Sequence, residues 1–120
     1  MVRDHREAWP EGYRGYRQDN NLTIAEALRA VGYHTAMAGK WHMGKAYTPV
    51  DCGFDDFYGF LNGAMSYWNP ERYVRLPETA PRREYARGEF YATDVITDYA
   101  IDFAARAREL HKPLFLHVSY

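Results

Sequence analysis

Cysteine is nearly absent from this sequence of 120 residues, and long apolar runs are absent altogether. The single cysteine, Cys52, excludes an intrachain disulfide framework and a zinc site made of several thiolates. No apolar run approaches the roughly 18 residues that a membrane-spanning helix needs. Charge of one sign is not in excess either. The formal net charge is −1, so we expect no long-range attraction to nucleic acid or to an anionic membrane.

The first twenty residues lack the apolar stretch of a signal peptide, because they are polar and charged. The location of the protein therefore stays open between periplasmic or secreted and cytoplasmic. Residues 1–20 also lack a hydrophobic period, and we expect an irregular N-terminal segment there. No internal repeat or low-complexity segment interrupts residues 21–120. We expect them to form part of one domain.

Several patterns do predict helices and strands. Thr23 and Glu26 form a capping box, which predicts a short helix with Ile24, Ala27, Leu28 and Val31 on one face and a left-handed end at Gly32. Residues 33–38 are typical of a strand, which Gly39 should end. A loop should then run to about residue 88, with short strands or turns near residues 56–60 and 73–76. A connection of that length is usually functional.

The last third of the chain has a clear helical period. Between residues 90 and 110, apolar side chains recur every three or four positions, with acidic residues near the start and basic ones near the end. Residues 114–120 follow as a nearly continuous apolar run, typical of a parallel strand buried on both faces. The order helix, strand, long loop, helix, strand predicts an α/β fold, in which a crossover helix joins two parallel strands.

The residues most suggestive of chemistry follow the first predicted strand. Residues 32–44 read GYHTAMAGKWHMG, and Lys40 and His42 leave the strand together. Their spacing lets both side chains point the same way if the backbone stays extended. An ammonium group beside an imidazole suits an anionic, tetrahedral substrate, because lysine supplies charge and donors while histidine can transfer a proton. Taken alone, such a pair is a weak signal.

The wider sequence resembles the type I sulfatases, enzymes that hydrolyse sulfate esters and share an alkaline-phosphatase-like fold. The run GYxTxxxGKWHxG resembles the second signature of that family. Residues 22–28 resemble the helix before it, and residues 53–59, GFDDFYG, resemble the GFDxFxG segment after it. The helix from Thr93 and the strand KPLFL at residues 112–116 also resemble the family. The resemblance covers residues 21–120.

The resemblance implies roles for two residues of this chain. Lys40 would bind the substrate sulfate and help to hold the nucleophile, and His42 would hydrogen-bond the hydroxyl of a formylglycine hydrate. It also implies a calcium or other divalent cation in the site, acting as a Lewis acid. Cys52 does not lie in the family's CxPSR motif, so we do not expect it to become formylglycine. The metal ligands of the family are not recognisable here either, and we expect this chain alone to be inactive.

Other polar and aromatic residues admit two interpretations. For Asp55 and Asp56 we favour loop capping or exposure to solvent over metal binding, and for His34 and His117 a packed position in a strand over ligation. Trp41 should anchor its loop against the core. The aromatic and amide side chains of the long loop either line a substrate cleft or pack on the surface, with packing favoured: Tyr47, Tyr67, Trp68 and Asn69.

Three functions stay open at the level of the sequence. The first is part of a sulfuric ester hydrolase acting on a small-molecule or saccharide sulfate, in which the rest of the sulfatase domain would be the chain's partner. The second is a remnant that binds anions without turnover, or a truncated product that does not fold. The third is a related phosphatase or phosphonate hydrolase, because both esters are tetrahedral anions. The GKWH run favours the sulfatase.

Overall fold

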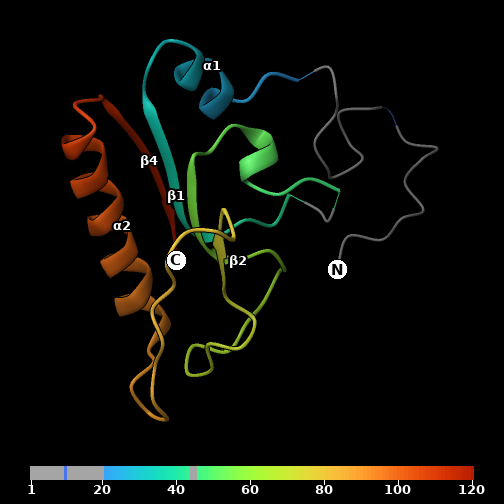
Figure 1. The fold of residues 1–120 in the computed structure, drawn as a ribbon. Coiled ribbons are helices and arrows are strands. Elements are labelled where there is room, and N and C mark those ends of the chain that lie inside the picture. The colour runs from blue at the N-terminus through green and yellow to red at the C-terminus, as the bar shows by residue number, and fades with distance from the viewer. Residues whose placement is uncertain (1–9, 11–20, 44–45) are drawn as a thin grey trace.

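The computed structural model describes residue 10 and residues 21–43 and 46–120. In chain order the elements are α1 (Ile24–Ala30), β1 (His34–Lys40), the 3-10 helix η2 (Val50–Cys52), β2 (Asp56–Phe60), β3 (Val74–Leu76), α2 (Ala92–Glu109) and β4 (Leu114–Ser119) (Figure 1). The irregular segment expected at the N-terminus lies outside the described residues, apart from Pro10. Within the described part, no helix is long and apolar enough to cross a membrane.

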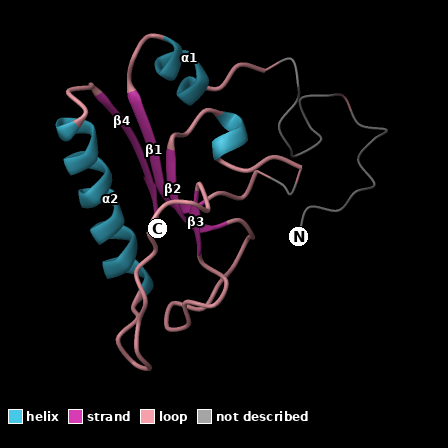
Figure 2. Cartoon of the chain, viewed as in Figure 1, coloured by secondary structure: helices cyan, strands magenta, loops and turns pink. Residues whose placement is uncertain are grey.

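The strands form one mixed sheet in the order β3-β2-β1-β4. β1 lies at its centre and runs parallel to both β2 and β4, while β3 runs antiparallel to β2. The helix α2 joins β3 to β4 and lies along one face of the sheet (Figure 2). β1 and β4 are parallel neighbours and α2 lies in the connection between them, so the predicted crossover helix is confirmed, although β2 and β3 also lie in that connection.

Alternation along β1 divides the apolar residues between two faces of the sheet. Ala36 and Ala38 pack with the buried side of α2, whose apolar stripe includes Ile96, Tyr99 and Phe103. Met37 faces the other way and packs with Ala25 of α1 and two phenylalanines from the η2–β2 segment. The molecule thus has three layers, with β1 covered on both sides.

The capping box forms as predicted, but the buried face of α1 is different. The hydroxyl of Thr23 accepts a hydrogen bond from the backbone N–H of Glu26, whose carboxylate accepts from the N–H of Thr23. Ala25 is the buried residue of this helix, whereas Ile24 and Val31 are 67% and 71% exposed. Ala27 and Leu28 are half-buried, so the predicted apolar face is wrong for Ile24 and Val31, which face solvent.

Two strand predictions also need correction. The first strand does not end at Gly39 but continues to Lys40. β4 is parallel, as expected, but it is not buried on both faces: it forms an edge of the described sheet, His117 is exposed and Val118 is 37% exposed. The packed position expected for His117 is therefore wrong. The short strands expected in the long loop are present as β2 and β3, while η2 was not predicted.

Candidate functional site

Lys40 is the last residue of the central strand, at the edge where parallel strands present their carboxyl ends. It pairs with Phe60 of β2, and the N–H of Trp41 donates to the carbonyl of Phe60 at 2.9 Å, one step beyond the strand. The Lys40 side chain is half-buried. In α/β sheets the ligand-binding residues lie beyond the carboxyl ends of strands. The backbone that carries Lys40 is fixed at such an end.

His42 lies two residues further on, where the backbone is no longer extended. Its φ is 55°, in the left-handed region, so the extended geometry assumed from the sequence does not hold here. The imidazole is exposed on one side. On the other side its Nε2 lies 3.1 Å from the point where a Cβ would stand on Gly63, in the loop after β2. The turn at His42 thus directs the imidazole onto a neighbouring loop.

Two glycines bring the strand ends into close contact just before Lys40. A Cβ on Gly39, whose φ is 110°, would stand 1.8 Å from the carbonyl oxygen of Ser119 in β4. A Cβ on Gly59 of β2 would stand 1.8 Å from the carbonyl oxygen of Gly39. Real Cβ contacts are never that short, so these positions require glycine. The pairing of Gly39 with both neighbours sets the spacing of three strands at the site edge.

Trp41 anchors the loop that carries His42. Its indole N–H donates to the carbonyl of Tyr47 at 3.0 Å, which closes the loop on itself. Its ring lies edge-on to Phe54, with centroids 6.3 Å apart, and packs against the cluster on the α1 side of the sheet. The anchoring role expected for Trp41 is confirmed, and it limits how far His42 can move.

Asp55 and Asp56 have structural partners, and the expectation that Asp56 faces solvent is wrong. Asp55 caps the chain as expected, because its carboxylate accepts from the backbone N–H of Thr35 at 3.0 Å. Asp56 is 2% exposed and is paired with the guanidinium of Arg75, which is also buried. Arg106 of α2 adds a second cation, with its Nε 3.2 Å from Asp56 Oδ2.

His34 completes this buried cluster, in the packed strand position that the sequence predicted. Its Nε2 lies 3.1 Å from Asp56 Oδ2, without the angles of a hydrogen bond, so we treat the contact as electrostatic. Its Nδ1 lies 3.5 Å from Asp55 Oδ2. Sequence patterns gave no signal for Arg75, because a charged residue within a short strand is normally taken to face outward.

The described residues do not fit a calcium site or a formylglycine precursor. No group of three or more His, Cys, Asp or Glu side chains gathers there in a way that could hold a metal ion. The carboxylates of Asp55 and Asp56 are engaged by backbone and by arginine. Cys52 is fully buried, and its carbonyl accepts from Thr23 at 2.6 Å. Cys52 precedes β2 and so lies near the amino-terminal ends of the parallel strands, whereas Lys40 lies at the carboxyl end of β1.

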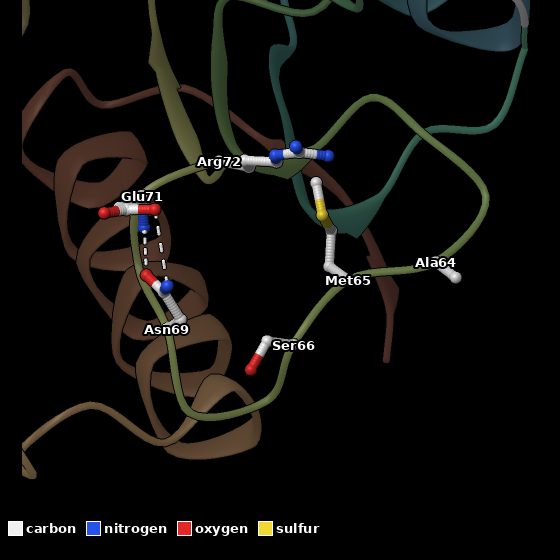
Figure 3. Close-up of a pocket in the computed structure, with 6 residues that line it drawn as sticks. All are labelled: Ala64, Met65, Ser66, Asn69, Glu71 and Arg72. Carbon is white, nitrogen blue, oxygen red and sulfur yellow. Dashed lines mark hydrogen bonds between the residues drawn. The ribbon is translucent and has the colours of Figure 1, made fainter.

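The loop after β2 forms a pocket beside the candidate site. It starts one residue beyond the Gly63 that contacts His42 and encloses about 460 Å³. Figure 3 shows the Arg72 guanidinium extending over Met65, with Asn69 and Glu71 on the opposite side. The lining residues are Ala64, Met65, Ser66, Asn69, Glu71 and Arg72. Of the loop residues singled out in the sequence, Asn69 lines this pocket, and Tyr67 and Trp68 lie in the same loop.

Three tyrosines in the core behind this loop keep their protons near neutral pH. Burial raises the pKa of Tyr58 well above its usual range, and the neighbouring Tyr85 adds to the effect. Burial also raises the pKa of Tyr73, and it raises the pKa of Tyr85 to about 12. A protonated phenol can donate, and the hydroxyl of Tyr73 donates to the carbonyl of Ser66 at 3.1 Å. Tyr73 therefore supports the loop, and none of the three phenols is expected to serve as a base near neutral pH.

Comparison with known proteins gives a consistent result. The sequence matches the family model described as Sulfatase over residues 3–120, which takes in most of the N-terminal segment that patterns alone did not assign. Arylsulfatase J of Mus musculus is 33% identical in an alignment 112 positions long, which covers 84% of this chain and 18% of that protein. The chain therefore spans about a fifth of the length of this relative.

Solved structures agree in fold. The PsFucS1 sulfatase from Pseudoalteromonas sp. is similar with a TM-score of 0.63 and 25% identity, over 82% of this chain and 26% of that one. A structure of BT4656 in complex with its substrate D-glucosamine-2-N,6-O-disulfate is similar with a TM-score of 0.54 and 28% identity, over 87% and 19%. The α/β fold class expected from the sequence is confirmed. From the match to the family model, which spans nearly the whole chain, it follows that this chain belongs to the sulfatase family.

Proposed function

We propose that this chain is part of a sulfuric ester hydrolase and supplies Lys40 and His42 to its sulfate site. The observation that carries the proposal is the position of the GKWH run, which ends the central strand and enters a loop anchored by Trp41. Family membership adds the reaction class, because the matched relatives are named as sulfatases. The substrate is a sulfate ester, with a saccharide as the class we favour.

The two side chains have complementary chemistry for such an ester. The ammonium group of Lys40 offers a positive charge and three hydrogen-bond donors to sulfate oxygens. Because Lys40 is half-buried, water screens its attraction to the sulfate less than at an exposed site. The imidazole of His42 can hold or move a proton near neutral pH. The turn at His42 places its imidazole beside the loop at Gly63. Together they suit binding of the anion and proton transfer to a group beside it.

Calcium and formylglycine belong to the proposal only as groups that the family resemblance implies. Calcium would offset the negative charge of the substrate. Since the described residues fit neither the metal site nor the nucleophile, we assign no step of the reaction to them. What this chain contributes is the binding and orientation of the ester.

The test uses the full-length protein as its gene encodes it and p-nitrophenyl sulfate as the substrate. Lys40→Ala should lower kcat/KM by about 100-fold or more, as loss of one preorganised electrostatic donor typically does. His42→Asn should lower kcat by a similar factor of about 100, as expected for a proton-transfer group. Asparagine is chosen because it tolerates the left-handed backbone at this position.

Two matched controls separate site effects from general damage. Lys112→Ala removes an exposed lysine, and His111→Asn makes the same change at a histidine whose φ is 52°, close to that of His42. Both controls should retain activity within twofold of the parent protein. If Lys40→Ala and His42→Asn were equally harmless, the proposed roles would be refuted. Faster turnover of p-nitrophenyl phosphate than of the sulfate would point instead to a phosphatase, and binding of inorganic sulfate without any turnover would indicate the inactive remnant.

A further inference from the structure

The pocket after β2 has the dimensions and the composition of a ligand site. Its volume of about 460 Å³ lies within the range of about 300–1,000 Å³ that is typical of small-molecule sites. Its lining combines the apolar Met65 with hydroxyl, amide, carboxylate and guanidinium groups. Met65 packs against the core cluster that contains Ala38 of β1 and Phe60 of β2. The floor of the pocket is thus attached to the strands that position Lys40.

The loop is held in shape by its own hydrogen bonds and by neighbouring elements. The carbonyl of Tyr67 accepts from the N–H of Ala92, at the first turn of α2, at 2.8 Å. The carbonyl of Pro70 accepts from Arg82 at 3.1 Å. Within the pocket, the N–H of Glu71 donates to Asn69 Oδ1 at 2.9 Å. A site whose backbone is fixed before binding loses less conformational freedom when a ligand arrives.

An exposed aromatic surface adjoins the pocket. Trp68 is 71% exposed, and its ring lies tilted against that of Tyr91, with centroids 4.6 Å apart; Tyr91 adjoins the start of α2. Tyr67 is 51% exposed and lies 6.4 Å from the same ring of Tyr91. We call these three residues, Tyr67, Trp68 and Tyr91, the aromatic shelf. Burial in the core does not explain why these rings gather, because Tyr67 and Trp68 both face solvent. Both lie beside the ring of Tyr91.

A sugar ring has the two kinds of surface that the shelf and the pocket offer. Its C–H faces are apolar and pack on flat aromatic rings, whereas its hydroxyls donate and accept hydrogen bonds at the edges. Asn69 and Glu71 are hydrogen-bonded to each other, with Asn69 Nδ2 donating to Glu71 Oε2 at 3.4 Å, which leaves Glu71 Oε1 as an acceptor for such a hydroxyl. The exposed guanidinium of Arg72 forms no ion pair or hydrogen bond within the described ranges, so its five donors remain for a hydroxyl or an anionic substituent.

We infer that the aromatic shelf and the adjoining pocket bind the sugar ring of a saccharide sulfate, whose sulfate group reaches Lys40 and His42. The inference rests on the proposed function, and it names the part of the protein that selects a saccharide over a simple aryl ester. Continuity of the chain supports the geometry: the loop contacts His42 at Gly63 and begins to line the pocket at Ala64. A ligand spanning both would meet charge at one end and stacking at the other.

The test compares two classes of substrate in the full-length protein. The probes are p-nitrophenyl sulfate, which has no hydroxyls, and the 6-sulfates of glucose, galactose, glucosamine and N-acetylgalactosamine. Trp68→Ala and Arg72→Gln should each raise KM for the best saccharide sulfate by about tenfold, the loss expected for one stacked ring or one charged donor. Both variants should leave kcat/KM for p-nitrophenyl sulfate within about twofold. Trp68→Phe should recover most of the loss, since it restores a flat ring.

The outcomes distinguish the inference from the function on which it rests. Arg87→Gln, at an exposed arginine outside the pocket, is the charge control and should change neither substrate. Turnover of the aryl ester with no saccharide sulfate accepted, or equal losses on both substrates together with a lower melting temperature, would overturn the inference and leave the sulfatase proposal standing. No turnover of any sulfate ester would refute the proposed function. In that case tryptophan fluorescence decides whether the protein binds the saccharide. A fluorescence change on adding the sugar should be seen in the parent protein and lost in Trp68→Ala.

Discussion

Asp56 shows how strongly a single buried charge can determine stability in this protein. Its carboxylate is buried against Arg75, which is itself 8% exposed, and it also meets Arg106 and His34. We predict that Asp56→Asn lowers the free energy of unfolding by about 3–5 kcal/mol, because the neutral amide leaves a buried guanidinium without its counter-charge. Thermal or denaturant unfolding of the full-length protein measures this loss.

An exposed ion pair in the same molecule is the matched control. Asp102 contacts Arg83 at 2.5 Å, but its side chain is 48% exposed. The same change, Asp102→Asn, should cost about 0–1 kcal/mol, because water screens the pair and solvates either partner alone. Equal effects of the two substitutions would contradict the view that burial gives the Asp56 cluster its importance.

At the scale of elements, the spacing of β1, β2 and β4 depends on glycine. Gly39 combines a φ of 110° with a near contact to the backbone of Ser119. We predict that Gly39→Ala costs about 3 kcal/mol or more, since a strained φ alone costs about 1–3 kcal/mol and the clash with backbone adds to it. Because Lys40 is the next residue, kcat/KM for p-nitrophenyl sulfate should also fall. Both quantities are measured on the full-length variant.

Gly32 separates the two contributions. It has a similar φ of 95°, but a Cβ there would meet nothing within 4 Å. Gly32→Ala should therefore carry only the conformational cost, about 1 kcal/mol at a helix end, and leave activity unchanged. If Gly39→Ala proved no worse than Gly32→Ala, close strand approach would not be what requires glycine at residue 39.

At the scale of the whole molecule, local patterns predicted the elements well, and distant contacts account for what they missed. The capping box at Thr23 and the period of α2 depend on neighbours a few residues away, so the sequence alone reveals them. Burial of Asp56 depends on Arg75 and Arg106, which lie 19 and 50 positions further along the chain. Nothing in the local pattern around Asp56 indicates either partner.

The candidate site divides in the same way. Lys40 and His42 were found because they stand close together in a motif, whereas the pocket was only in part foreseen. Asn69 was a candidate, but Glu71 and Arg72 were not, since a loop brings them together with no period to reveal it. The exposed state of β4 also escaped prediction. An apolar run specifies a strand, but not whether further strands or helices cover it in the described sheet.

That exposed strand leads to a prediction for the 120-residue chain studied alone. β4 leaves one edge of the described sheet unpaired, with Val118 partly exposed on it. An apolar edge strand is a template for pairing with another copy, so we expect the isolated chain to self-associate.

Val118→Lys should shift the isolated chain toward monomer in size-exclusion chromatography, because a charge on an edge strand opposes pairing. Ile101→Lys changes an equally apolar residue, 62% exposed on α2, and should not. Similar shifts in both variants would mean that general surface charge, rather than the β4 edge, controls association.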